Sequence, residues 1–98
     1  MSLGASGTIS VWANLQPREV HHMCAAFLDG DVETARSLQL AALPLIHGLF
    51  SEVNPIPVKE ALAQMGMIEA NYRLPLTAMS NGAAQALRSA LKEVGLVA

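Results

Sequence analysis

Apolar residues recur every three or four positions along most of this chain, a spacing that predicts α-helices. A first helix is predicted from Pro17 to Leu28, because proline in the first turn of a helix forfeits no hydrogen bond. Asp29 and Gly30 end this helix, and Gly30 suits the left-handed closing position. The apolar stripe of this helix consists of Val20, Met23, Cys24, Phe27 and Leu28.

A second helix begins almost at once. Asp31 is predicted to cap it, and Glu33 complements the positive end of its dipole. The helical spacing continues to about Phe50, through Leu38, Ala41, Ala42, Leu45, Ile46 and Leu49. Pro44 lies inside this helix, where it deletes the hydrogen bond to Leu40 and predicts a kink.

A third helix is predicted to start near Pro55 or Pro57 and to run through Met65 to Gly66. Asn54 is a candidate cap for it. Beyond this helix, the segment from Met67 to Ala78 lacks helical periodicity and contains Pro75, which predicts a loop.

The last helix is predicted between Ser80, a cap residue, and Val94, with Gly95 as the closing glycine. Its stripe consists of Ala83, Ala84, Leu87, Ala90, Leu91 and Val94. The predicted fold class is therefore mainly α, with four helices.

One segment has a different pattern. From Thr8 to Ala13 polar and bulky residues alternate, and β-branched residues are concentrated, which predicts one short N-terminal strand. A single strand leaves backbone N–H and C=O groups unpaired along both edges, so it needs a sheet that this sequence does not supply.

Composition adds a second feature that needs a partner. Of the 98 residues, 52% are hydrophobic and only 14% are charged, whereas soluble domains carry about 25% charged residues. We interpret the excess as faces meant for another chain or for a larger domain. The alternative is an Ala- and Leu-rich helical domain with a dense core.

The net charge and the length of the apolar runs argue against two classes of partner, nucleic acids and membranes. The net charge is −2 and no basic patch exists, which argues against a nucleic-acid partner. The longest apolar run falls far short of the ~20 residues that span a bilayer, so no membrane segment is expected. Cys24 is the single cysteine, which fits a reducing cytoplasm and allows no internal disulfide.

No candidate metal site or nucleophile emerges from the residues. His21 and His22 are neighbours that point about 100° apart on a helix, so they cannot share one metal, and we expect surface histidines. Cys24 lies on an apolar stripe, where a buried free cysteine packs as a small hydrophobe. His47 falls late in the second helix, where a cation suits the helix dipole.

The two lysines, Lys59 and Lys92, are both expected in solvent rather than in the apolar pocket that a Schiff-base lysine needs. The glycines of residues 4–7 precede a predicted strand and not a helix, so they do not predict a phosphate site. We therefore predict no catalytic, cofactor-binding or metal-binding residue, and no cofactor.

Three motifs together resemble a known family. The motifs are Gly4-Ala5-Ser6-Gly7-Thr8-Ile9-Ser10-Val11-Trp12-Ala13-Asn14, Asn54-Pro55-Ile56-Pro57-Val58-Lys59 and Arg73-Leu74-Pro75-Leu76-Thr77. They closely resemble the C-terminal third of the dihydrodipicolinate synthase family, within the N-acetylneuraminate lyase superfamily. The resemblance covers essentially the whole chain from Gly4. The Asn-Pro-Ile-Pro-Val-Lys form is similar to the synthase branch rather than the sialic-acid lyase branch.

The resemblance implies the last strand and helix of a (β/α)8 barrel, followed by a helical C-terminal domain. Residues 1–30 would be the last β/α unit of a truncated barrel, and residues 31–98 the helical domain. The predicted strand would then pair with strands one and seven of the barrel, and the surplus apolar faces would pack on barrel helices.

The resemblance also implies a function. Family members condense pyruvate with aspartate semialdehyde through a lysine Schiff base, on the route to lysine. The Schiff-base lysine, relay tyrosine and substrate arginine have no matching position here, and Tyr72 is not the relay tyrosine. At most residues Gly7 to Ser10 would border the pyruvate pocket, because barrel active sites gather at the carboxyl ends of the strands.

We therefore expect a lyase fragment that is itself inactive, whether deliberate, proteolytic or a truncated gene product. Its expected partners are further copies of itself or the missing barrel portion, with no small-molecule substrate for the fragment alone. The alternative is a stand-alone helical module that binds another protein through its apolar stripes.

Overall fold

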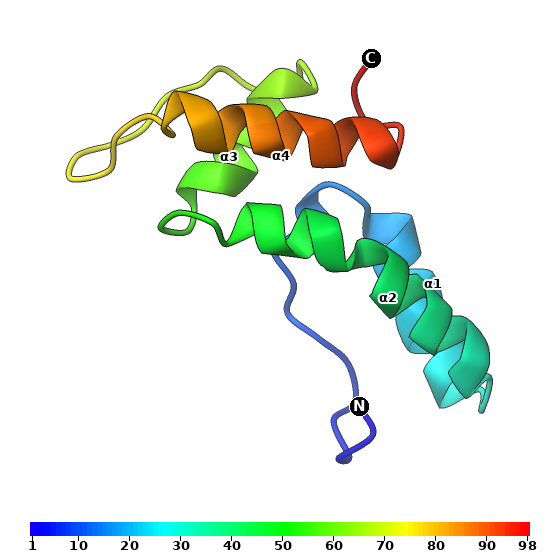
Figure 1. The fold of residues 1–98 in the computed structure, drawn as a ribbon. Helices are drawn as coiled ribbons and strands as arrows, with labels where there is room; N and C mark the ends of the chain where they lie inside the picture. Colours follow the sequence, from blue (N-terminus) through cyan, green and yellow to red (C-terminus); the bar gives the residue numbers. More distant parts are fainter. The chain divides into compact units, whose positions relative to one another are not determined.

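The computed structural model describes all residues from Met1 to Ala98 and contains helices but no strand. In chain order the elements are the short 3-10 helix η1 (Trp12–Asn14), α1 (Pro17–Leu28), α2 (Val32–Leu49), α3 (Ile56–Gln64) and α4 (Asn81–Glu93) (Figure 1). The predicted mainly α class with four helices is confirmed. The chain divides into two compact units, Met1–Leu43 and Pro44–Ala98.

The predicted strand at Thr8–Ala13 was wrong for this chain. Residues 5–10 have no regular secondary structure, and Trp12–Asn14 turn into η1. No backbone N–H between Ala5 and Val11 donates a hydrogen bond. The physical reason is that a strand exists only when it is paired, and no second strand is present to accept these donors.

Within the first unit, α1 begins and ends where the sequence predicts. Pro17 occupies its first turn, and Gly30 closes it with a left-handed φ of 89°. The Asp31 N–H donates to the Ala26 carbonyl at 2.8 Å, and the Gly30 N–H donates to the Phe27 carbonyl at 3.0 Å. These bonds satisfy carbonyls that the end of a helix otherwise leaves free.

Asp31 caps α2, as predicted. The Thr34 N–H donates to its Oδ1 at 3.1 Å, and the Thr34 hydroxyl donates to its Oδ2 at 2.6 Å. These hydrogen bonds, first from the Thr34 side chain and then from its backbone, hold the pKa of the Asp31 carboxyl below its usual value. Pro44 lies inside α2 and is the first residue of the second unit.

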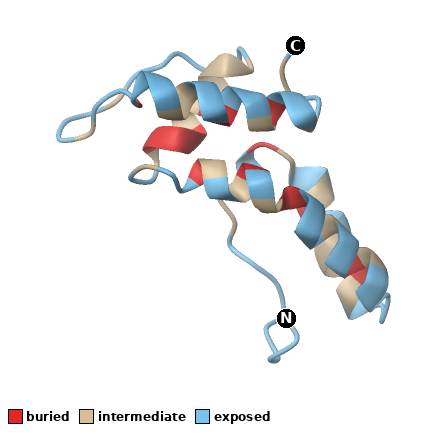
Figure 2. Cartoon of the chain, viewed as in Figure 1, coloured by how far each residue is buried: buried red, intermediate tan, exposed pale blue.

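The second unit has its own apolar core. Its largest fully buried side chains are Leu45, Leu49, Pro57, Leu87 and Leu91. Helices α3 and α4 contact each other, and α3 carries a broad buried surface, seen as red on its ribbon in Figure 2. Gly48 of α2 approaches α4 closely, since a Cβ there would lie 3.2 Å from Leu87 Cδ1.

The start of α3 differs from the prediction in one respect. Pro55, and not Asn54, is the cap residue, and no side chain caps this helix. The peptide bond between Asn54 and Pro55 is cis. The predicted loop at residues 67–78 is confirmed, as is Gly95 as the closing glycine of α4. Gly66, after α3, has the same left-handed φ of 76°.

Candidate functional site

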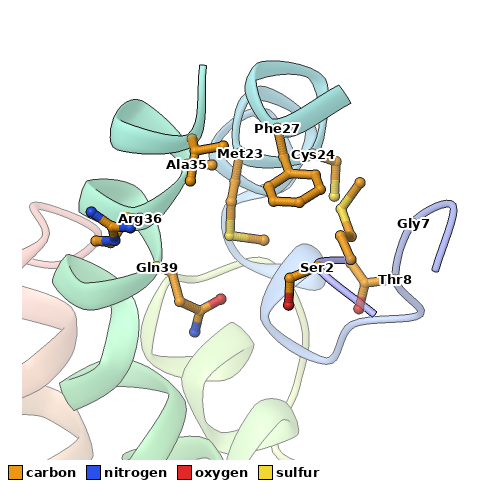
Figure 3. A pocket seen from close by; sticks show the side chains of 11 residues that line it. Ser2, Gly7, Thr8, Met23, Cys24, Phe27, Ala35, Arg36 and Gln39 are labelled. Carbon is orange, nitrogen blue, oxygen red and sulfur yellow. The ribbon is translucent and has the colours of Figure 1, made fainter. Parts of the chain in front are cut away.

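A pocket of about 460 Å³ lies in the first unit, between the N-terminal segment and two helices. Figure 3 shows Met23, Cys24 and Phe27 from α1 on one side and Ala35, Arg36 and Gln39 from α2 on another. The N-terminal segment completes the wall with Met1, Ser2, Gly7 and Thr8, and Val32 also contributes.

The pocket is chemically divided. Three sulfur-bearing side chains, those of Met1, Met23 and Cys24, and one aromatic ring contribute apolar surface, while Arg36 and Gln39 place polar groups on the α2 side. Arg36 already donates to Glu33 Oε1 at 2.7 Å in an exposed ion pair, which contributes little to stability. Its lining includes Ser2, Thr8 and Cys24 but no His, Asp, Glu or Lys, so no lining nucleophile has a lining base beside it.

The histidines lie away from the pocket lining. His21 and His22 are exposed on α1, as predicted, and His47 is exposed in the last turn of α2. Cys24 is half-buried rather than fully buried. No three His, Cys, Asp or Glu side chains gather in a way that could hold a metal ion.

The two lysines differ in their surroundings. Lys92 is exposed on α4, as predicted. Lys59 is half-buried on α3, and its Nζ lies 5.6 Å from the centre of the Tyr72 ring. A cation over an aromatic face is attracted by the ring quadrupole. Lys59 is therefore positioned by a structural contact, and its expected solvation is only partial.

A polar cluster ties the loop before α4 to α3. The Tyr72 hydroxyl donates to Glu60 Oε2 at 3.0 Å, and Gln64 Nε2 donates to Glu60 Oε1 at 2.8 Å. Gln64 Nε2 also reaches the Ala84 carbonyl of α4 at 3.3 Å. Burial, followed by the adjacent Glu60 carboxylate, raises the pKa of Tyr72 to about 12.

A second link joins the α2–α3 connection to the start of α4. Glu52 accepts hydrogen bonds from both the N–H and the hydroxyl of Ser80. Ser80 is the cap residue of α4, as predicted, but its hydroxyl makes no capping bond to the helix. The carboxylate of Glu52 thus places a negative charge near the positive end of the α4 dipole.

Comparison with known proteins shows the family of the chain. The model of the dihydrodipicolinate synthetase family matches residues 1–94. The chain belongs to this family. The 4-hydroxy-tetrahydrodipicolinate synthase of Lachnoclostridium phytofermentans is 50% identical over 97 residues, which are 99% of this chain and 33% of that protein. The same enzyme of Acetivibrio thermocellus is 48% identical over the same shares.

Solved structures agree with the family assignment. The dihydrodipicolinate synthase of Thermotoga maritima has a TM-score of 0.95 and 43% identity, covering 98% of this chain and 32% of that one. The chain thus spans about a third of the length of the curated relatives it matches. The resemblance inferred from the three motifs is confirmed.

Gly7 and Thr8 of the N-terminal segment both lie on the wall of the pocket in Figure 3. No helix of the structure is both long enough and apolar enough to cross a membrane.

Sequence reasoning missed the two polar links of the second unit. Glu60 and Gln64 are one helical turn apart, so their pairing was accessible from the spacing. The partners Tyr72 and Ser80 lie 12 and 28 residues from the carboxylates they bind, and no local pattern marks such pairs.

Proposed function

We propose that this chain is the C-terminal third of a lyase that condenses pyruvate with aspartate semialdehyde, in the synthesis of lysine. The observation that carries the proposal is the high identity to 4-hydroxy-tetrahydrodipicolinate synthases along 99% of the chain. The order and spacing of the three motifs support the same interpretation.

Within such an enzyme the chain would contribute structure rather than the reacting groups. Residues 1–30 would form the last β/α unit of the barrel, and residues 31–98 the appended helical domain. Barrel catalysis draws groups from several strands, so the Schiff-base lysine, tyrosine and arginine would come from residues outside this chain. We expect no cofactor, and we place the enzyme in the cytoplasm.

The chain alone is then expected to be inactive. Incubation with pyruvate and borohydride should leave Lys59 and Lys92 unmodified by mass spectrometry, because Lys92 is exposed on α4 and Lys59 is half-buried beside the Tyr72 ring rather than enclosed in an apolar pocket. An adduct on either lysine would overturn the proposal. The Lys59→Arg and Lys92→Arg variants identify which amine reacted.

Activity should appear only when the missing part is supplied. The N-terminal two-thirds of the Lachnoclostridium phytofermentans relative provides a suitable complement, because the two sequences are 50% identical where they overlap. Mixing the two polypeptides should restore condensation, with the imine trapped on the added polypeptide. Full activity of that polypeptide without this chain would contradict a structural role.

A stand-alone interaction module is the second candidate function. Large apolar side chains are exposed in both units: Leu3, Ile9, Leu28, Val32, Leu40, Phe50, Val53, Met67, Ile68 and Leu74. Exposed apolar surface of this extent fits self-association or docking onto a barrel portion, and equally a different protein partner. A stable monomer that binds neither itself nor the complementing polypeptide would favour the module.

A further inference from the structure

We propose that Asn81 is a site of spontaneous backbone modification, at which a succinimide forms with Gly82 and opens to aspartate or isoaspartate. Asn81 and Gly82 are the first two residues of α4, and both are exposed. Asparagine directly before glycine is the pair least hindered for this reaction, because glycine places no side chain beside the attacking nitrogen.

The groups that react are free in this structure. The Asn81 side-chain amide makes no hydrogen bond, and the Gly82 N–H has no acceptor. In a capped helix, the side-chain oxygen of the cap residue accepts a hydrogen bond from such an N–H group. Ser80 is the cap here, but its hydroxyl donates to Glu52 instead of accepting from the helix.

The surroundings leave room for ring closure. A side-chain carbon placed on Gly82 would meet nothing within 4 Å. Closure requires the first turn of α4 to leave the helical conformation, and helix ends open at low cost. Since the Gly82 N–H is already unpaired, opening at this point sacrifices no hydrogen bond of that donor.

The reaction balances with water alone. The Gly82 nitrogen attacks Asn81 Cγ and forms a C–N bond while its proton passes to water. The bond from Cγ to Nδ2 breaks, and ammonia leaves. Water then adds to one of the two imide carbonyls, which gives aspartate when the ring nitrogen leaves Cγ and isoaspartate when it leaves the backbone carbon.

The other asparagines of the chain are hindered by their neighbours. Asn54 precedes proline, which has no N–H to attack with. Asn14 donates to the Val11 carbonyl, and the next N–H, that of Leu15, is bonded to the Trp12 carbonyl. Asn71 donates to Glu69 and precedes the bulky Tyr72.

A second glycine pair offers a matched internal comparison. Asp29 precedes Gly30, but the Gly30 N–H donates to the Phe27 carbonyl at 3.0 Å. The backbone N–H is therefore hydrogen-bonded at Gly30 and has no acceptor at Gly82. Both glycines are exposed and have open space at the Cβ position, but Gly30 has a left-handed φ of 89°, whereas Gly82 lies in the first turn of α4.

Conversion would change the start of α4. An aspartate at position 81 adds a negative charge beside Ser80, whose hydroxyl and N–H are bound by the Glu52 carboxylate. An isoaspartate also lengthens the main chain by one methylene at the first helical residue. Both products alter the link between Glu52 and Ser80, so the modification would act on the join between the α2–α3 connection and α4.

The test is incubation of the complete chain in mildly alkaline buffer, then trypsin digestion and mass spectrometry. Cleavage after Arg73 and Arg88 releases residues 74–88, in which Asn81 is the sole asparagine. Because helix ends open at little free-energy cost, the folded chain should convert Asn81 within about tenfold of the rate of the isolated 74–88 peptide. A methyltransferase specific for isoaspartate identifies the second product.

Two variants serve as controls. Asn81→Gln should abolish the mass change in this peptide, because a six-membered imide forms far more slowly. Gly82→Ala should slow the reaction several-fold while leaving the helical circular dichroism unchanged. The proposal is overturned if the folded chain reacts more than about a hundredfold more slowly than the peptide, or if Asn14 or Asn71 converts as fast as Asn81.

Discussion

At the scale of single residues, a close approach between α2 and α4 in the second unit depends on the absence of a side chain at Gly48. A Cβ on Gly48 would lie 3.2 Å from Leu87 Cδ1, and Leu87 is fully buried. An alanine there gains about 1 kcal/mol of helix propensity but incurs about 1–3 kcal/mol of overpacking. We expect Gly48→Ala to lower the free energy of unfolding by about 1 kcal/mol in urea.

Gly82→Ala is the matched control for this substitution. It also lies in a helix, but nothing within 4 Å opposes its new Cβ. We expect it to raise the free energy of unfolding by up to about 1 kcal/mol, because only the propensity term remains. Equal effects of the two substitutions would contradict the close approach of α2 and α4.

Tyr72 gives the second prediction at this scale. Its pKa is raised to about 12, above the unfolded value near 10. The phenol therefore contributes its stabilisation fully below pH 10, and that contribution is lost as the pH rises through 12. Tyr72 is the one tyrosine of the chain, so the ultraviolet absorbance of phenolate reports it alone.

The measurement is a spectroscopic pH titration of the folded chain, compared with the Glu60→Gln variant. Removing the carboxylate should shift the phenol midpoint downward, although burial keeps it above the unfolded value. A midpoint near 10 in the unchanged protein would show that the hydroxyl of Tyr72 is not bound to Glu60.

At the scale of elements, the capping of α2 makes a prediction about acid. Bonds from Thr34 lower the pKa of Asp31, so the cap stabilises the helix above the unfolded pKa. That stabilisation is lost as the pH falls through the folded pKa. Asp31→Ala should lower the thermal midpoint at neutral pH and remove this acid dependence, whereas Asp31→Asn should keep most of the cap. Circular dichroism melts across the acidic range measure both effects.

The elements also show how far local sequence carries a fold. Helices α1 and α4 were predictable because their stripes repeat at helical spacing and caps and glycines mark their ends. The segment Thr8–Ala13 was mispredicted because alternation reports a preference for strand, while a strand forms only when another one pairs with it. The prediction of Asn54 as the cap of α3 was wrong because the adjacent Pro55 occupies the cap position.

Side-chain clusters were less accessible than helices. The bond from Tyr72 to Glu60 and the bonds from Ser80 to Glu52 join residues that are 12 and 28 positions apart in the sequence. Their existence depends on tertiary structure and not on any spacing in the sequence. The family, in contrast, was identifiable from three motifs because they are specific in residue type, order and distance.

At the scale of the whole molecule, the unpaired N-terminal segment predicts association. The N–H groups from Ala5 to Val11 are unbonded, and Ile9 is fully exposed. Such a segment is a template for pairing with another chain. We expect the mass in sedimentation to rise with concentration, and Ile9→Pro to lower it, because proline removes a donor from the edge.

Ile9→Val is the control, since it keeps both the donor and the β-branched side chain. It should associate as the unchanged protein does. If the unchanged protein sediments as a single chain at every concentration, or if Ile9→Pro associates equally well, pairing through this segment is not the source of association.

Pro44 has a consequence for the local opening of the helix α2. It lies within α2, where the first compact unit ends along the chain and the second begins, and it has no amide hydrogen to donate to the carbonyl of Leu40. The helix α2 is therefore continuous but lacks one backbone hydrogen bond at the residue where the first compact unit ends and the second begins. Deuterium uptake along α2 should then change stepwise at this proline, with the earlier amides exchanging as Met1–Leu43 opens and the later ones as Pro44–Ala98 opens.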